Sequence, residues 1–141
     1  MSEAQREVQV RPARGDDLPF VFATWLRSVH ASSLFAKRIP RPVFFERHHA
    51  AIQRLLDRGA ELSVACLKED DGVVVGYLAR EGKLIHFVYV KGPFRRMGVA
   101  RALLERAGLS PDECSCTHWT YQLDALAPKW PKLVYDPYRM F

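Results

Sequence analysis

The sequence of 141 residues contains only three cysteines and no long apolar run. Because Cys66, Cys114 and Cys116 form an odd set in a chain long enough to bury a core, reduced thiols are expected instead of a disulfide framework. No second pair of ligands stands at zinc spacing from the Cys-x-Cys pair, so no metal site is expected. The polar start MSEAQREVQV lacks the apolar core of a signal peptide, and no segment is long enough to cross a bilayer. These absences predict a cytoplasmic protein that has no contact with a membrane.

The sequence also lacks any block of like charge, although its net charge is +5. Acidic residues separate the basic ones along the whole chain, which does not indicate a nucleic-acid-binding tail. A polyanionic partner and a small phosphorylated ligand are equally compatible with this charge. Nucleic acid is not expected as a partner, because the sequence has no element that would read a groove.

With neither an internal repeat nor a low-complexity tract, residues 1–141 are predicted to form a single domain. Alternating and helical spacings of apolar residues then predict the order of its elements. We expect a strand at 8–14, a helix at 15–30, a loop at 31–42, a helix at 43–58, and three strands between 61 and 90, joined by turns at Asp71-Gly72 and Glu81-Gly82.

The most informative stretch is an apolar strand that breaks into a basic loop and turns at once into a helix. Leu84–Val90 is almost continuously apolar and is followed by Gly92-Pro93, which cannot continue a strand. Helical spacing begins again at Val99 and continues to Ala107. The start of such a helix presents unpaired N–H groups and favours an anion, and Gly98 allows the backbone to approach a ligand closely. Positive charge beside it comes from Arg95, Arg96 and Arg101.

The loop sequence Arg95-Arg96-Met97-Gly98-Val99-Ala100 fits the pattern Q/R-x-x-G-x-G/A and follows a strand that ends in VYV. In this strand-to-helix context the chain, from Val8 to about Thr120, resembles the GNAT superfamily of acyl-CoA-dependent N-acyltransferases. The resemblance implies an α/β (α+β) fold with a mixed, splayed sheet, helices on both faces and a truncated C-terminal end. It further implies acetyl-CoA as cofactor, with pantetheine along the backbone of about Phe87 to Val90 and pyrophosphate on the N–H groups of Arg96 to Ala100. The predicted cofactor-binding residues are Val88, Val90, Arg95, Arg96, Met97, Gly98, Val99, Ala100 and Arg101.

Acetylation of an amine needs a base for the ammonium and an acid for the thiolate. Where the family often carries a carboxylate on the fourth strand, this chain has none, so His86 is predicted as the base; a hydrogen-bonded core histidine is the alternative. By resemblance, the acid is a tyrosine beyond the fifth strand, expected at 114–120, and Tyr121 is predicted for this role. A packed aromatic ring with its hydroxyl in water is the alternative for Tyr121. His48 and His49 of the second helix are interpreted as half-buried residues without a catalytic role.

The C-terminal segment QLDALAPKWPKLVYDPYRMF departs from the GNAT pattern, because it has room only for one short helix and one terminal strand near Leu133 to Tyr138. This ending, with FAKRIP and VYDPY, resembles small GNAT-like proteins encoded by bacteriophages. Its four aromatic residues either close the end of the sheet or contact another protein.

Two functions therefore stay open. The first is an N-acetyltransferase that acetylates a small-molecule or peptide amine. The second is a non-catalytic GNAT-fold structural or interaction protein, such as a virion component, whose partner binds the C-terminal aromatic segment. Fold alone does not separate them.

Overall fold

The computed structural model describes residues 7–141, and residues 1–6 of the polar N-terminal segment lie outside the described residues. Within 7–141, six strands form one sheet in the order β1-β2-β3-β4-β5-β6. The strands are β1 (Val8–Pro12), β2 (Glu61–Leu67), β3 (Val74–Glu81), β4 (Leu84–Val90), β5 (Ser115–Cys116) and β6 (Val134–Tyr135). The helices are α1 (Leu18–Ser32), α2 (Leu34–Lys37), α3 (Arg41–Asp57), α4 (Val99–Arg106) and α5 (Tyr121–Leu126). In this part of the chain no helix is both long and apolar enough to span a membrane.

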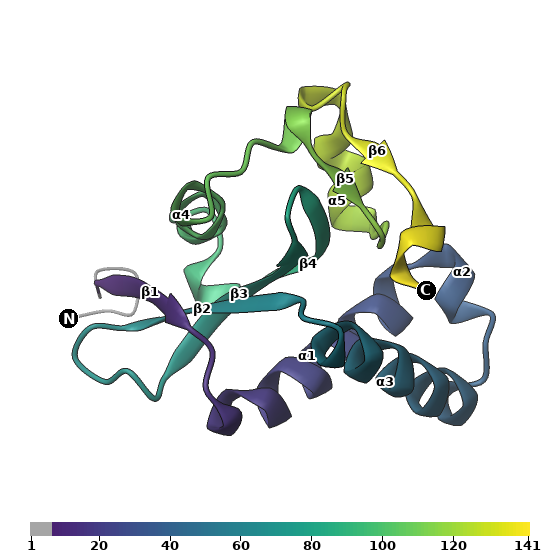
Figure 1. Cartoon of the computed structure of the whole chain (residues 1–141), viewed down its shortest axis with the longest axis horizontal. Coiled ribbons are helices and arrows are strands. Elements are labelled where there is room, and N and C mark those ends of the chain that lie inside the picture. The colour runs from purple at the N-terminus through teal and green to yellow at the C-terminus, as the bar shows by residue number, and fades with distance from the viewer. Residues whose placement is uncertain (1–6) are drawn as a thin grey trace.

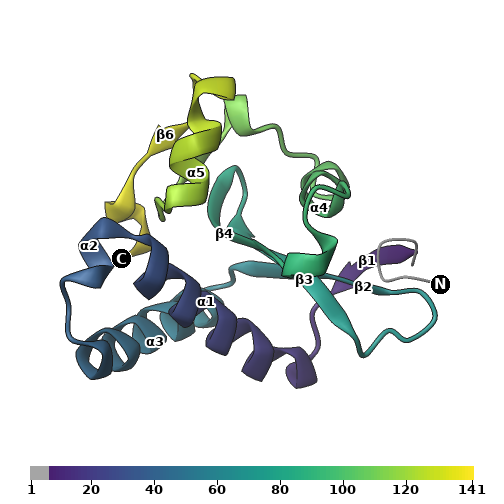
Figure 2. The same ribbon diagram turned by 180° about the vertical axis from the view of Figure 1, so that it is seen from behind.

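The sheet is mixed and splayed. Strands β1 to β4 form an antiparallel meander, whereas β5 lies parallel to both β4 and β6. Helices α1 and α3 cover one face and α4 the other, and β5, β6 and α5 stand away from the end of the meander (Figures 1 and 2). The predicted fold class is therefore confirmed.

Two apolar clusters hold the helices to the sheet. On the first face, Trp25 of α1 and Ile52 of α3 are fully buried together with Tyr77 of β3. On the second face, Leu103 of α4 packs with Leu78 of β3 and is also fully buried. Each such side chain contributes about 2 kcal/mol through apolar burial. These contacts fix the helices on the sheet and thereby set the position of α4 beside β4.

The apolar spacing of the helix at 15–30 predicts one buried face, and so does that of the helix at 43–58. The predicted residues are Leu18, Val21, Trp25 and Val29 in the first helix, and Phe45, Ile52, Leu55 and Leu56 in the second. Val21, Trp25 and Val29 form the buried side of α1, as the spacing predicts. In α3, Phe44 is buried, whereas the predicted core residue Phe45 is only partly buried. The buried face of α3 is thus rotated by one residue at the N-terminal end of the helix.

Several predicted boundaries differ from the structure, since the first strand ends at Pro12 and the terminal strand is confined to Val134–Tyr135. Two predictions were wrong in a way that affects the site. The segment 31–42, predicted as a loop, contains the one-turn helix α2, which the Lys37 N–H closes by donating to the Ser33 carbonyl and which Ala36 anchors in the core. The predicted fifth strand at 114–120 is confined to Ser115–Cys116, because β4 pairs with β5 only there before the two strands diverge. The residues after Cys116 consequently line the gap between the strands.

Candidate functional site

One edge of β4 is unpaired along its C-terminal half. On its other side β4 pairs with β3 over its whole length, but toward β5 it pairs only at Leu84 and Ile85. The N–H and C=O groups of Phe87 to Val90 that point to the gap are therefore free for a ligand with amide groups. A β-bulge precedes this edge: Ala79 and Arg80 of β3 face Phe87 and Ile85, which leaves His86 as the extra residue.

A cavity of about 890 Å³, here named the β4–α4 cavity, runs along this edge to the start of α4. Its lining includes β4 from Ile85 to Val90, the loop residues Arg95 and Arg96, and Gly98. Between Arg96 and Gly98 the backbone is unusual, because Arg96 has φ 66° and Gly98 has φ 79°. Left-handed residues in such a loop turn N–H groups toward a common point, which makes an anion-binding concavity.

The start of α4 offers further donors, since no side chain caps it. An added Cβ on Gly98 would meet no atom within 4 Å, so the space in front of this residue is open. Behind it, Arg95 Nε donates to the Val90 carbonyl at 2.9 Å and ties the loop to the end of β4. Of the predicted cofactor-binding residues, Val88, Val90, Arg95, Arg96, Gly98, Val99, Ala100 and Arg101 line the cavity, and Met97 does not.

Beside the cavity lies a chain of hydrogen bonds between two buried histidines, His86 and His118, and the partly buried His48. Its first end is at the surface. Arg58 donates to the Glu81 carboxylate at 2.6 Å. His86 Nε2 lies 2.6 Å from the same carboxylate, and His86 Nδ1 lies 2.9 Å from Thr117 Oγ1. An ionised carboxylate only accepts, so Nε2 of His86 carries the proton and Nδ1 accepts from the Thr117 hydroxyl.

The second end of the chain lies under α3. Trp25 Nε1 donates to His118 Nε2 at 3.3 Å, and an indole N–H can only donate. His118 therefore carries its proton on Nδ1 and donates it to Thr117 Oγ1 at 3.0 Å. His48 Nε2, 2.8 Å from His118 Nε2, must then donate as well. The protonation deduced from the two ends agrees: each hydrogen bond is donated in the direction from His48 through His118, Thr117 and His86 to Glu81.

Burial keeps these imidazoles neutral. It lowers the pKa of His48 to about 4 and the pKa of His118 well below 6.5. Burial also lowers the pKa of His86, although Glu81 acts in the opposite sense. The hydrogen bond from Arg58 lowers the pKa of Glu81, which is therefore ionised near neutral pH.

The two predicted catalytic residues occupy different surroundings. His86 is 1% exposed and lines the cavity, but both of its nitrogens are engaged by Glu81 and Thr117. Tyr121 begins α5, is 47% exposed, lies outside the cavity lining, and has its ring 5.0 Å from the Lys37 ammonium. Their roles as base and acid stay predictions.

Sequence reasoning missed most of the histidine chain. His48 was given no role, and His118, Thr117 and Glu81 were not singled out. The signal available was the dipeptide Thr117-His118 directly after the short strand β5, which pairs with the strand that carries His86. Nothing in the spacing alone indicates that a residue of α3 meets this dipeptide.

The strand-loop-helix cradle and the open strand edge have the geometry that suits an anionic ligand with an extended amide-containing arm. The model of the acetyltransferase (GNAT) family matches residues 26–108, more than half of the chain. The chain therefore belongs to the GNAT acetyltransferase family.

Comparison with solved structures agrees with the fold. The chain is similar to apo YjaB from Escherichia coli (24% identity, TM-score 0.47, covering 72% of this chain and 64% of that one). It is also similar to a GCN5-related N-acetyltransferase from Rhodopseudomonas palustris (20% identity, TM-score 0.51, covering 71% of this chain and 62% of that one). A transcriptional regulator from Bacillus halodurans is similar over 87% of this chain and 89% of its own (21% identity, TM-score 0.51). The chain thus spans less than two thirds of the first two proteins. The likenesses to the second and third proteins, with TM-scores of 0.51, show the fold alone. A search of curated proteins found no match.

Proposed function

We propose that this protein is an N-acetyltransferase that transfers the acetyl group of acetyl-CoA to a primary amine. The observation that carries the proposal is the continuity of the unpaired β4 edge with the glycine-containing start of α4 along one cavity. Pantetheine carries amide groups that suit the free edge of Phe87 to Val90, and pyrophosphate suits the uncapped helix start. Membership of the GNAT family supports the same cofactor.

The residues present fit this cofactor. Space is open in front of Gly98, and the cavity volume of about 890 Å³ lies within the range of ligand sites. Bound acetyl-CoA would supply the thioester whose acetyl group is transferred. Arg96 and Arg101 would place positive charge beside the pyrophosphate, and the Arg95–Val90 bond would hold the loop in register with the strand.

In place of the predicted role as base, we propose that His86 is a positioning residue, because it holds Thr117 and Glu81 in line while both of its nitrogens are occupied. Tyr121 stays the proposed acid for the thiolate. The helix start that carries it borders the cavity at Thr120 and Gln122.

Replacing Gly98 by Asn is expected to weaken CoA binding at least tenfold while the fold is retained. Asn tolerates the left-handed conformation better than other residues with a Cβ, so the added strain is small. Its side chain would fill the space in front of the helix start and separate the pyrophosphate from the N–H groups. Isothermal titration calorimetry with CoA measures the loss, and circular dichroism checks the fold.

Gly108 provides a matched control, because it ends the same helix, has φ 71° and also faces open space. Gly108→Asn should carry the same backbone cost and leave CoA affinity unchanged. Equal affinity of the two variants, or no binding of acetyl-CoA to the wild-type protein at millimolar concentration, would remove the proposal.

A non-catalytic role in an assembly is the second candidate, and the exposed aromatic rings of the C-terminal segment favour it. Tyr138 is 82% exposed and Phe141 77% exposed. Such rings suit a protein contact. Co-purification of a partner that Tyr138→Ala releases, from a protein that binds no acetyl-CoA, would support this function over catalysis.

A further inference from the structure

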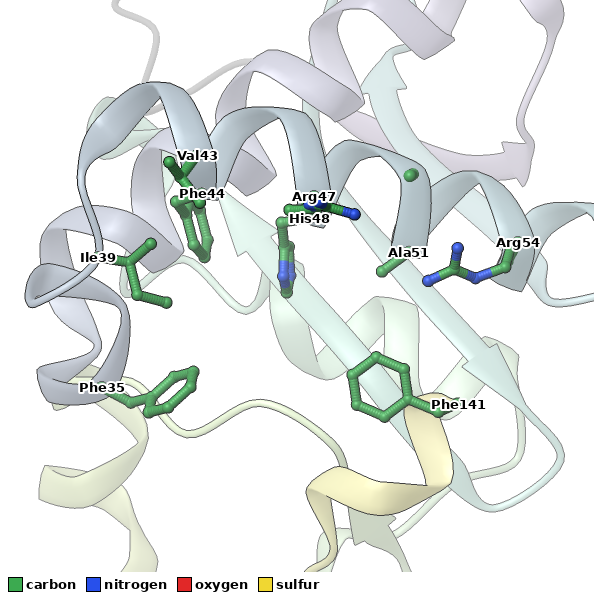
Figure 3. Close-up of a pocket in the computed structure, with 10 residues that line it drawn as sticks. Phe35, Ile39, Val43, Phe44, Arg47, His48, Ala51, Arg54 and Phe141 are labelled. Atoms are coloured by element: carbon green, nitrogen blue, oxygen red, sulfur yellow. The ribbon is translucent and has the colours of Figure 1, made fainter.

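A second cavity, here named the α3 pocket, lies between α3, α2 and the last residue, Phe141. It has a volume of about 380 Å³, near the lower limit for a small-ligand site. Most of its wall is apolar, and Figure 3 shows Phe35 and Phe141 facing the side chains that point down from α3. The residues labelled there are Phe35, Ile39, Val43, Phe44, Arg47, His48, Ala51, Arg54 and Phe141.

Two guanidinium groups supply the positive charge of this pocket. Arg47 and Arg54 are two helical turns apart, and in Figure 3 both side chains extend along the helix toward Ala51. Within residues 7–141 neither forms an ion pair. A single carboxylate over Ala51 would therefore be attracted by both groups.

The only other titratable side chain in the wall of the α3 pocket, as far as the described residues show, is His48. Its Nε2 donates to His118, so the neutral ring has its lone pair on Nδ1. Nδ1 has no partner among residues 7–141, whereas both nitrogens of His118 and of His86 are engaged. His48 is thus the one member of the histidine chain that can take up a proton without first breaking a hydrogen bond.

We propose that the α3 pocket is the acceptor site: it binds a small primary amine that carries an apolar group and a carboxylate, and His48 takes the proton of that amine. This inference depends on the proposed N-acetyltransferase function. Arg47 and Arg54 hold the carboxylate, the phenylalanine rings hold the apolar group, and His48 lies one helical turn from Ala51.

The fixed direction of the hydrogen bonds gives the proton a route. When Nδ1 of His48 accepts a proton, the proton on Nε2 can shift to His118, and one proton moves at each further bond through Thr117 and His86 to Glu81. Glu81 is 27% exposed beside Arg58 and can release the proton to water. No histidine of the chain needs to hold the charge, which agrees with their neutral state.

The ammonium gives one proton to His48, and its nitrogen forms the amide bond with the thioester carbon while the C–S bond breaks. The second N–H proton passes to the sulfur, so the products are the amide, the thiol of CoA and one proton. His48 and His118, with ring centroids 5.0 Å apart, separate the α3 pocket from the β4–α4 cavity, so transfer requires the amine to reach past the edge of this pair.

Binding tests the pocket independently of activity. L-phenylalanine and phenethylamine differ only in the carboxylate, and NMR titration of protein loaded with CoA, which carries no acetyl group to transfer, should show at least tenfold tighter binding of L-phenylalanine, with shifts at His48. Arg47→Ala combined with Arg54→Ala should abolish this preference. Arg38→Ala is the control, because Arg38 is exposed at the end of α2 but does not line the pocket.

Equal affinity for the two probes, or binding of L-phenylalanine that the double variant leaves unchanged, would overturn the proposal. So would wild-type protein that binds acetyl-CoA but does not bind L-phenylalanine. Failure to bind acetyl-CoA would contradict the proposed function instead, while the same titration on the protein alone would still test the α3 pocket.

His48→Gln tests the proton route. Glutamine can still donate to His118 through its amide but cannot take up a proton, so kcat for L-phenylalanine should fall roughly 100-fold with the affinity for acetyl-CoA unchanged. The matched control is His49→Gln, since His49 is the next residue of α3, stacks on Phe22 and does not line the pocket. A normal kcat in His48→Gln, or an equal loss in His49→Gln, would show that His48 does not take the proton.

Discussion

Acidification from pH 6.5 to about pH 5 is expected to lower the free energy of unfolding by about 2 kcal/mol or more. The cause is the histidine chain, because burial lowers the pKa of His48, His86 and His118 in the folded protein. In the unfolded chain these rings take up protons near pH 6.5, whereas the folded protein takes them up only at lower pH. The unfolded state then binds more protons, so stability falls as the pH decreases.

His48 alone sets the scale of this effect. With a folded pKa of about 4 against 6.5 in the unfolded chain, it contributes roughly 2 kcal/mol of destabilisation by pH 5. The other two histidines act in the same direction. Carboxylates do not interfere in this range, because the lowered pKa values of Asp17 and Glu81 make their effect appear only below their ordinary values of 3.8 and 4.5.

Urea unfolding at several pH values measures the effect. The wild-type free energy of unfolding should decrease steadily from pH 6.5 to about pH 5. The slope should be smaller in His48→Gln, because the difference in protons bound by the unfolded and folded states is then smaller by nearly one. Stability that stays constant over this interval would mean that the histidines are not buried as neutral rings.

The sequence predicted the scaffold well because apolar spacing and turn residues act locally. The stripe of Val21, Trp25 and Val29, and the strand that ends before Gly92-Pro93, are visible without tertiary information. The glycine at the start of α4 was visible in the same local pattern, whereas its left-handed conformation is seen only in the structure.

The histidine chain could not be predicted, because it depends on where distant segments meet. His48 and His118 are 70 residues apart, and their contact follows from the way β5 ends and leaves β4. The bulge at His86 likewise depends on the register between β3 and β4 and not on the sequence of either strand alone. Such long-range geometry decides which nitrogen atoms are free, and therefore which histidine can act as a base.

The end of the chain returns to the core, and this also could not be read from its composition. Met140 is 5% exposed and packs in the cluster formed by α1, α3 and the sheet. Next to it, Arg58 donates to the carbonyl groups of Arg139 and Met140 at 2.8 and 3.2 Å. The rings of this segment, by contrast, are half-exposed or exposed, with Tyr138 at 82%. The segment thus combines one core residue with an aromatic surface.

Met140→Ala is expected to destabilise the protein by about 2–5 kcal/mol, because it removes a buried side chain and leaves a cavity between α3 and the sheet. For a domain of this size the melting temperature should fall on the order of 10 °C. Tyr138→Ala, two residues away and exposed, should change stability by less than about 0.5 kcal/mol. Differential scanning calorimetry of the two variants separates the two uses of the segment. A melting temperature that Met140→Ala leaves unchanged would show that the segment does not close the core, whereas the expected difference would leave Tyr138 as the residue at which a protein contact can be tested without loss of the fold.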